Sequence, residues 1–484
     1  MHRFITWCAV ILMLAGAQRI AAADTAARPN IVFILADDLS WHDLRVYGNA
    51  WHDTPNLDRL ASQGMRFTQA YASAPICSAS RVAMLTGRSP ARLGFEFVTK
   101  EPGTKVDTDH PLATPPYPLN LPLEEVTIGE ALTKAGYRTG YYGKWHVSQH
   151  NGGYLGWSTT HGPLQQGFAE GDSEFGSHPY SEGRGTERKA PQPPLANGDY
   201  GDDALTDKAI DFLRRRKAEP FFLVLSHYYV HTPVRTRAKW LEEKYRKRLP
   251  AGADEGRAAF GAMVETLDHL VGRVLKELDD LKLAENTLVI FTADNGGHPE
   301  YSANGPARGS KWNVYEGGVR VPMFVRWPSR VKAGAVTATP VIGADLFPTL
   351  CAVAKTTPDA SIPRDGVDVT PVWFGTVKEL ERTQPFVWHF PYYHPEAGYA
   401  KARNGIGIDD FETSKTLPQS AIRMGDFKLV HFYEDDRDEL YNLASDPSEQ
   451  KDLAATNAAK RKELRQQLDA YLKSVGGRLP VAKK

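Results

Sequence analysis

Apolar runs that end beside acidic residues, and that alternate with amphipathic segments, constrain the fold of this chain most strongly. The run Ile31–Leu35 ends just before Asp37–Asp38, and Thr287–Thr292 ends just before Asp294–Asn295. The long amphipathic segment Ala258–Leu281 leads into the second run. Strands that alternate with helices predict a large, mostly parallel sheet flanked by helices on both faces. We therefore expect an α/β fold.

The same alternation recurs between these two strands. Further strands are expected at Met65–Tyr71, Arg138–Tyr142 and Phe221–Leu225, and further helices are expected to begin at Pro55, Ser80, Thr127 and Asp203. Ligands of such sheets bind beyond the carboxyl ends of the strands. We therefore expect the acidic pairs at 37–38 and 294–295 to converge there.

The sequence pattern changes after about Gly375. Short strands are expected at Phe386–Phe390, Ala421–Met424 and Lys428–Phe432, followed by a closing helix at Ala458–Val475. This pattern predicts a smaller α+β subdomain with a short antiparallel sheet. We divide the chain into a leader (1–23), a large N-terminal domain (24–375) and a C-terminal subdomain (376–484).

The leader has the order of a signal peptide. His2 and Arg3 precede the apolar run Ile5–Ala17, and Ala21–Ala23 offers small residues for cleavage before Asp24. The run is too short to span a bilayer comfortably. We therefore expect a secreted or periplasmic protein without stable membrane insertion.

Charge and cysteine content narrow the range of partners. The chain has 58 basic and 58 acidic residues and a net charge of zero, whereas a nucleic-acid binder typically has a basic surplus or stripe. Nucleic acid is therefore excluded as an expected partner, and an anionic substrate must be attracted by local cations. Beyond the leader only Cys77 and Cys351 remain, too few for a disulfide framework.

The acids at the strand ends predict a metal site. Asp37, Asp38 and Asp294 offer three carboxylates, and Asn295 offers an amide carbonyl. These hard oxygen ligands suit calcium or magnesium and suit zinc poorly. The alternative for Asp37–Asp38 alone is a solvated turn. The second oxygen-rich strand end favours the metal, with one calcium ion preferred over magnesium.

Cys77 lies among small polar residues and allows more than one interpretation. The ordinary one is a buried, inert thiol. A reactive thiolate is the second, because a helix is expected to begin near Ser80 and a helix N-terminus carries about half a positive charge. Cys351 lies in an apolar run and is expected to be inert.

The segment Pro75–Gly87 resembles the signature of the sulfatase family. The family pattern is Cys, any residue, Pro or Ala, any residue, Arg, and this chain has Cys77, Ala79 and Arg81 at those positions. Ala replaces the commoner Pro at position 79. The residue at position 79 affects which maturation enzyme acts on the cysteine.

Other motifs extend the resemblance over almost the whole chain from Arg28 to the closing helix. The second family signature is present as Gly136–Gly140 followed by Gly143–His146, with Tyr142 where a smaller residue is usual. Further matching segments are RPNIVFILADD, HTP, TADNGG, YEGGVRVPM and ELYNLASDPSEQKDL. The resemblance implies an arylsulfatase-like enzyme of the alkaline phosphatase superfamily, with residues 24–375 as its catalytic domain.

The resemblance also implies a third state for Cys77, a formylglycine made by a dedicated maturation enzyme. Its hydrate would attack the sulfur of a sulfate ester and expel the alcohol. The second hydroxyl then loses its proton, sulfate leaves, and the aldehyde is restored. A serine would form the same ester but would need water to cleave it.

Roles for further residues follow from the resemblance. Arg81, one helical turn after Cys77, would hold the hydrated side chain and the metal carboxylates. Lys144 and Lys311 match the two lysines that bind sulfate. His231 is assigned as general acid beside the leaving group and His146 as the base.

Loop residues offer candidates for a substrate pocket. Ser148–Asn197 is rich in Gly, Pro, His and Trp and is expected to form loops over the pocket, and His227 is expected to lie behind the reacting groups. The candidates for stacking or hydrogen bonding to a sugar are Trp157, His161, His298, Arg308, His389, Tyr392, Tyr393 and His394.

Three other functions remain open at this point. The superfamily includes phosphonate monoester and phosphodiester hydrolases with a similar cysteine motif. An inactive binder of anionic polysaccharide and a hydrolase that uses the unmodified thiol are the others. The leader, the neutral net charge and the aromatic loops favour an extracellular sulfated glycan or small molecule as substrate.

Overall fold

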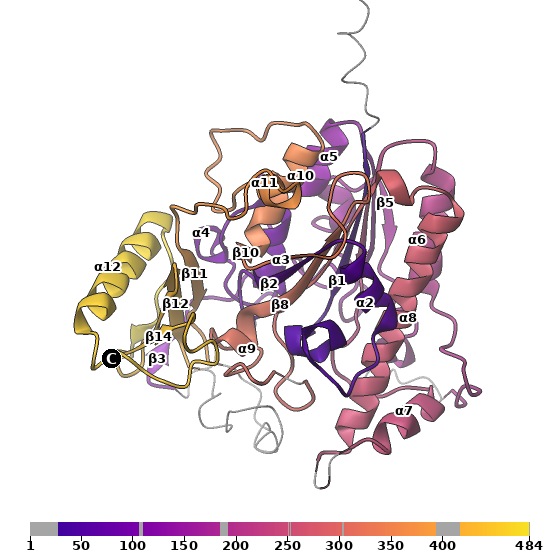
Figure 1. Cartoon of the computed structure of the whole chain (residues 1–484). Coiled ribbons are helices and arrows are strands. Elements are labelled where there is room, and N and C mark those ends of the chain that lie inside the picture. The colour runs from indigo at the N-terminus through magenta and orange to yellow at the C-terminus, as the bar shows by residue number, and fades with distance from the viewer. Residues whose placement is uncertain are drawn as a thin grey trace, which may run out of the picture.

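A nine-stranded sheet forms the centre of the molecule (Figure 1). The computed structural model describes residues 28–105, 110–183, 192–249, 251, 253–302, 304–393 and 417–483, so the expected signal segment lies outside it. The strand order is β10-β2-β8-β7-β1-β6-β4-β5, with β9 paired to β2. The strands are β1 (Asn30–Ala36), β2 (Met65–Tyr71), β4 (Arg138–Gly143), β5 (Glu170–Asp172), β6 (Phe221–Ser226), β7 (Thr287–Ala293), β8 (Arg320–Arg326), β9 (Ala335–Thr337) and β10 (Val341–Ile342).

The sheet is mostly parallel, as the sequence predicted. Strand β1 pairs in parallel with β6 and β7, and β4 pairs in parallel with β5 and β6. Among the described strands of this sheet, only β8 runs antiparallel, to its neighbours β2 and β7. Every residue of β1, β6 and β7 is buried. Burial on both faces explains why these strands are continuous apolar runs in the sequence.

Helices cover both faces of the sheet (Figure 1). One layer consists of α2 (Pro55–Ser62), α6 (Ala204–Arg216), α7 (Lys239–Arg246) and α8 (Gly256–Asp280), and the other of α3 (Cys77–Thr86), α5 (Ile128–Lys134), α10 (Leu346–Val353) and α11 (Thr370–Trp373). Shorter helices are α4 (Pro90–Leu93), α9 (Glu316–Val319), η1 (Trp41–Asp43), η2 (Arg45–Tyr47), η3 (Pro163–Gln165), η4 (Pro179–Glu182), η6 (Ala284–Asn286) and η7 (Gly343–Asp345).

Helix α3 begins earlier than expected. The sequence predicted a start near Ser80, but the first helical residue is Cys77. Ile76 precedes it in an extended conformation and provides no capping side chain, so the sequence carries no start signal there. Gly87 ends the helix in a left-handed conformation, as expected. Cys77 therefore lies at the N-terminus of the helix.

A four-stranded antiparallel sheet and a closing helix follow the central sheet, which confirms the expected C-terminal elements. They are β11 (Phe386–Phe390), β12 (Gln419–Met424), β13 (Phe427–Phe432), β14 (Arg437–Asn442) and α12 (Ala458–Val475). Leu464, Leu468 and Leu472 of α12 pack on one face of this sheet. The last strand, β15 (Val481–Ala482), pairs with β3 (Leu112–Ala113).

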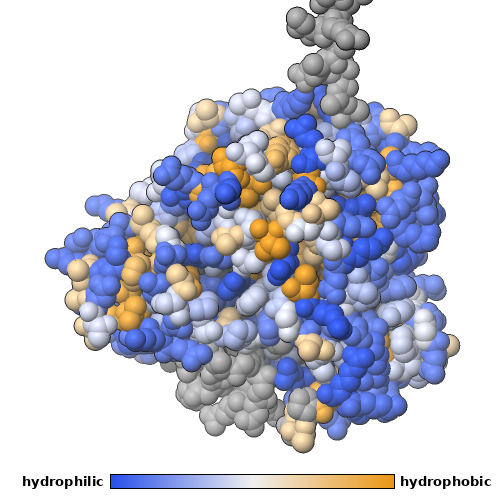
Figure 2. Space-filling view, viewed as in Figure 1, coloured by the Kyte–Doolittle hydropathy of each residue, from blue (hydrophilic) through white to orange (hydrophobic). Residues whose placement is uncertain are grey.

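The surface is predominantly polar on the face that Figure 2 shows, and apolar residues form small, separate groups there. Across the part of the chain that the structure describes, no helix is both long and apolar enough to span a membrane.

A buried ion network joins the two sheets. Lys428 on β13 places its Nζ 3.0 Å from Glu316 Oε1 and 2.8 Å from Glu449 Oε1. Glu449 Oε2 accepts the backbone N–H of Glu316 at 2.6 Å, and Tyr71 of β2 donates its hydroxyl to Glu316 at 2.8 Å. Lys428 is fully buried, so it compensates two carboxylates that water cannot reach.

Replacing Lys428 with Met should destabilise the protein severely. The variant would leave Glu449 buried without its cation and Glu316 with only the more distant Arg320, 3.8 Å away, and removing one partner of a buried pair costs about 3–5 kcal/mol. The free energy of unfolding from chemical denaturation measures this loss. Lys473→Met, at an exposed position of α12, serves as the control. Equal stability of the two variants would show that the network does not hold the sheets together.

Candidate functional site

Four adjacent parallel strands deliver the predicted residues to one edge of the sheet. In spatial order β7, β1, β6 and β4 lie side by side. Asp294–Asn295 follows β7, Asp37–Asp38 follows β1, His227 follows β6, and Lys144 and His146 follow β4. Sheet geometry therefore brings together residues that are far apart in the sequence.

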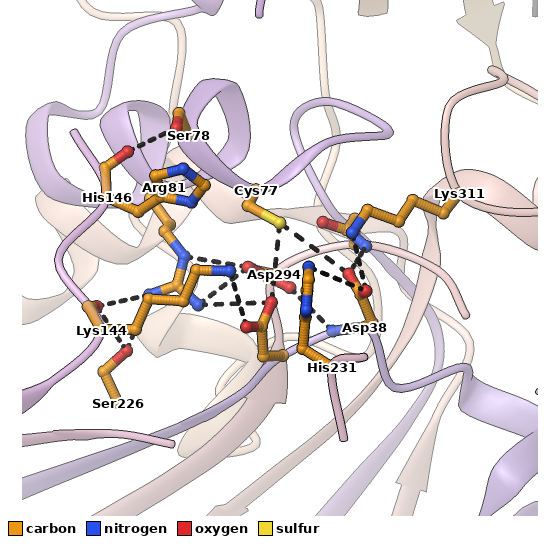
Figure 3. A network of polar contacts seen from close by, with 12 residues as sticks. Asp38, Cys77, Ser78, Arg81, Lys144, His146, Ser226, His231, Asp294 and Lys311 are labelled. Atoms are coloured by element: carbon orange, nitrogen blue, oxygen red, sulfur yellow. Dashed lines mark hydrogen bonds and ion pairs between the residues drawn. The ribbon is translucent and has the colours of Figure 1, made fainter. Parts of the chain in front are cut away.

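Three buried carboxylates meet three buried cations at this edge (Figure 3). Each carboxylate has one principal cation. The pairs are Lys144 Nζ to Asp37 Oδ2 at 2.6 Å, Lys311 Nζ to Asp38 Oδ2 at 2.7 Å and Arg81 Nε to Asp294 Oδ2 at 2.9 Å. Both lysines assigned to sulfate binding thus contact the aspartates of the predicted metal site.

Cys77 lies directly against this cluster. Its Sγ is 3.6 Å from Asp37 Oδ1 and 3.8 Å from Asp38 Oδ1. One ligand atom from each of Asp37, Asp38, Cys77 and Asp294 lies within 4.8 Å of the others. The structure therefore brings the cysteine and the predicted metal ligands into a single constellation.

The surroundings of Cys77 keep its thiol protonated. Burial raises the pKa of Cys77 well above its ordinary value, and the nearby Lys144 and Lys311 oppose this rise only in part. Asp294 and Asp37 raise it further. A protonated thiol is a poor nucleophile. The arrangement therefore disfavours a hydrolase that uses unmodified Cys77.

The oxygen donors fit a hard divalent cation. Burial and the neighbouring charge of Asp37 raise the pKa of Asp294 to about 6, despite Arg81. Asn295 donates its Nδ2 to Asp38 Oδ1 at 2.8 Å, while its buried Oδ1 has no hydrogen-bond partner among the described residues. Crowded carboxylates and an unsatisfied amide oxygen are the features that an oxygen-binding cation would relieve.

Arg81 ties three strand ends together. Besides Asp294, its guanidinium donates from Nη1 to the carbonyl of Lys144 at 2.7 Å and to Ser226 Oγ at 2.7 Å. Arg81 is itself 2% exposed. These hydrogen bonds reach residues at the ends of β7, β6 and β4, so Arg81 links the three strand ends.

The two predicted catalytic histidines border the same cluster. His231 Nε2 lies 3.6 Å from Asp38 Oδ2, and its Nδ1 lies 2.7 Å from both Thr232 O and the Tyr180 hydroxyl. His146 has a left-handed backbone, with φ of 57°, and its carbonyl accepts the hydroxyl of Ser78. Burial lowers the pKa of His231 to about 3 and that of His146 well below its ordinary value, so both imidazoles are neutral.

A cavity of about 420 Å³ opens over these groups. Of the predicted site residues, Cys77, His146, His231 and Lys311 line it. Of the proposed pocket residues that the structure describes, only His298 lines it. His227 is buried and is not part of the lining.

The other proposed pocket residues have different partners. Trp157 donates to Gly143 O, His161 contacts Thr160, Arg308 donates to Tyr441, His389 contacts Ser420, Tyr392 donates to Pro116 O and Tyr393 donates to Glu434. His394 lies outside the described residues.

Sequence reasoning missed several residues of the cavity wall. They include Phe97, Lys100, Gln149, His150, Tyr154 and Trp312. His150 and Tyr154 lie in the Gly-rich segment that was expected to cover a pocket. That expectation could have identified both residues as candidates for the cavity wall. Residues 97–104 form no helix or strand, and their sequence gave no such signal.

Comparisons with known proteins agree with this geometry. A family model described as Sulfatase matches residues 29–356, and one described as N-sulphoglucosamine sulphohydrolase, C-terminal, matches residues 310–476. Arylsulfatase A of Homo sapiens is 33% identical over 94% of this chain and 89% of its own length. N-acetylgalactosamine-6-sulfatase of Canis lupus familiaris is 34% identical over 75% of this chain and 70% of its own.

A solved structure extends the similarity to the fold. Ps i-CgsB in complex with k-i-k-neocarrahexaose is 26% identical, covers 92% of this chain and 93% of its own, and superposes with a TM-score of 0.70. The chain therefore belongs to the sulfatase family of the alkaline phosphatase-like superfamily, and it is a sulfatase enzyme.

Proposed function

We propose that this sulfatase hydrolyses a sulfate ester of a saccharide with a formylglycine made from Cys77. A calcium ion held by Asp37, Asp38, Asp294 and Asn295 would assist. The observation that carries the proposal is the contact of Cys77 Sγ with Asp37 and Asp38 at the base of the cavity.

Formylglycine would supply a hydrated aldehyde, one hydroxyl of which attacks sulfur. Cys77 is suited to this change because it lines the cavity that admits the ester. It is only 2% exposed in the folded chain. A maturation enzyme must therefore reach it before folding is complete.

The lysines account for recognition of the sulfate group. A calcium ion would supply positive charge beside the sulfate. Asp37 and Asp38, which would hold the ion, accept hydrogen bonds from Lys144 and Lys311. With the ion neutralising these carboxylates, the two ammonium groups would be able to donate to sulfate oxygens and stabilise charge that develops in the transition state.

The histidines account for proton transfer. His146 is neutral and can accept the proton that must leave the Cys77 side chain after its modification. His231 is proposed to protonate the leaving oxygen. Its neutral resting form must first gain a proton, which a bound anionic ester would favour electrostatically. Each such proton transfer typically contributes about 10²–10⁴-fold.

The saccharide substrate is proposed from two relatives. Ps i-CgsB was solved with an oligosaccharide, and another relative is named for a sulfated amino sugar.

The leader pattern supports export with removal of residues 1–23, and the change of sheet supports a division near residue 375. Phosphonate monoester or phosphodiester hydrolysis is the alternative activity. Inactive binding is disfavoured because the described constellation has all its matched residues in place.

Replacing Cys77 with Ala should abolish turnover while the fold survives, because the variant removes the side chain that becomes the nucleophile. Activity on an aryl sulfate measures this, with circular dichroism as the folding check. Cys351→Ala, in buried helix α10, is the matched control and should keep activity. The wild-type Cys77 peptide should be lighter than the unmodified peptide by mass spectrometry; an intact thiol in active enzyme would contradict the mechanism.

Aryl sulfate should be hydrolysed faster than an aryl phosphodiester with the same leaving group. Both esters are monoanions, so their kcat/KM ratio compares recognition of the transferred group directly. Purified enzyme that has been produced with a maturation enzyme is the sample. A ratio in favour of the phosphodiester would transfer the assignment to the alternative hydrolase.

Calcium should raise the melting temperature of the protein. Binding to the folded state alone adds about 2.7 kcal/mol when calcium is at 100 times its Kd. Asp37→Asn should lose most of this calcium-dependent increment because it removes a charged ligand. Asp211→Asn, exposed on α6, should retain it. The same increment in all three proteins would place the calcium elsewhere.

A further inference from the structure

His231 is held by a buried turn that lies outside the cavity. The turn consists of His178 and the short helix η4 (Pro179–Glu182). His178 and Tyr180 are buried, and neither of them lines the cavity. Any influence of these two side chains on the reaction must therefore pass through His231, which does line it.

Two oxygen atoms determine which ring nitrogen of His231 faces the reacting groups. The Tyr180 hydroxyl oxygen and the Thr232 carbonyl oxygen each lie 2.7 Å from His231 Nδ1. A carbonyl oxygen only accepts hydrogen bonds, so the imidazole proton lies on Nδ1 and the Tyr180 oxygen is a second acceptor for it. Nε2 lies on the other side of the ring, 3.6 Å from Asp38 Oδ2 (Figure 3). Nε2 is therefore the nitrogen that is turned toward the site.

His178 holds the backbone of the same histidine. The Tyr180 backbone N–H donates to His178 Nδ1 at 3.2 Å, so the His178 proton lies on Nε2. His178 Nε2 then donates to the carbonyl oxygen of His231 at 2.9 Å. One turn of the chain therefore contacts both the ring and the backbone of His231.

The turn is anchored on both sides by bonds that do not involve His231. On one side, Ser177 Oγ donates to Asp203 Oδ1 at 2.8 Å. On the other, Arg235 Nη2 donates to the Pro179 carbonyl oxygen at 3.3 Å and lies 2.9 Å from Glu182 Oε2. A turn that is fixed at both ends supports the Tyr180 hydroxyl in one place.

Packing holds the Tyr180 ring independently of its hydroxyl. The ring centre lies 5.6 Å from that of Phe175 and 5.9 Å from that of Tyr228, whose ring is almost perpendicular to it. Phenylalanine would keep these ring contacts and remove only the oxygen that faces His231. Tyr180→Phe therefore separates the role of the hydroxyl from that of the ring.

A fixed ring matters to a proton donor. Transfer of a proton requires a short and nearly linear hydrogen bond between the donor and the leaving oxygen. An imidazole that turns about its Cβ–Cγ bond, or that carries its proton on the other nitrogen, presents the wrong atom to the ester for part of the time. The hydrogen bond with Tyr180 opposes both changes.

We propose that Tyr180 is a positioning residue of the reaction, whose hydroxyl holds His231 Nδ1–H so that Nε2 faces the leaving oxygen. The inference rests on the general-acid role proposed for His231 and adds a residue that acts through it. As the bond between sulfur and the leaving oxygen breaks, the proton on Nε2 moves to that oxygen. The proton on Nδ1 stays with Tyr180 and Thr232, which leaves the neutral tautomer that these contacts favour.

The dependence of the rate on the leaving group tests this inference. The substrates are aryl sulfates whose phenols range from strongly acidic (4-nitrophenol) to weakly acidic (phenol and 4-methoxyphenol), and kcat/KM is measured for each. A weakly acidic phenol needs the proton most, because it leaves poorly as an anion. Tyr180→Phe should stay within about twofold of wild type on the 4-nitrophenyl ester and lose about tenfold on the weakly acidic phenols.

Two comparisons show whether the effect passes through His231. Tyr228→Phe is the matched control, since its buried hydroxyl donates to Ser173 O at 3.0 Å in the same aromatic cluster, and it should keep the wild-type dependence. His231→Ala should show a steeper dependence than wild type. Adding Tyr180→Phe to His231→Ala should change the rates no further, because the two residues act as one unit.

An equal loss on every ester in Tyr180→Phe would indicate a structural role and overturn the inference. A wild-type dependence in Tyr180→Phe would overturn it too, as would a full effect of Tyr180→Phe in the His231→Ala background. Wild-type turnover of the 4-nitrophenyl ester distinguishes these results from failure of the proposed function. With that turnover present the sulfatase function stands, and its absence contradicts the function itself.

Discussion

The pairing of three buried carboxylates with three buried cations is the interaction on which the site depends. Asp37, Asp38 and Asp294 are completely buried, and each would be costly to keep ionised without Lys144, Lys311 or Arg81. The six charges cancel. A divalent cation bound to this cluster would leave it positive and would give a chain with no net charge a local field that attracts anions.

Parallel strand order explains how the cluster forms. Strands β7, β1, β6 and β4 are neighbours whose carboxyl ends lie at one edge, and each is followed by residues of the site. Arg81 comes from helix α3, which also begins with Cys77. One helix therefore carries both Cys77 and the cation that bonds to the strand ends, and about one helical turn sets their relative placement.

The predictable part of the structure was the part with strong local patterns. Strands such as β1 and β7 and the acids that follow them could be read from apolar runs, because burial on both faces leaves a clear signature. The start of α3 could not be predicted from the sequence, because Ile76 offers no capping side chain. Lys144 and Lys311 were recognised only by family resemblance, since a single lysine ordinarily indicates exposed surface. Lys100 had neither a regular element nor a motif to mark it.

The C-terminal sheet is part of the site's support. The segment that carries Lys311 is anchored on one side by the Trp312 N–H to Pro75 O bond of 2.8 Å, next to Cys77. On the other side Arg308 donates to Tyr441 of β14 at 2.6 Å, and Glu449 binds the Glu316 N–H. The two matching family models overlap at residues 310–356, which include Lys311. The segment that carries Lys311 contacts both sheets, so the C-terminal elements help to place Lys311 beside Asp38, although none of their described residues lines the cavity.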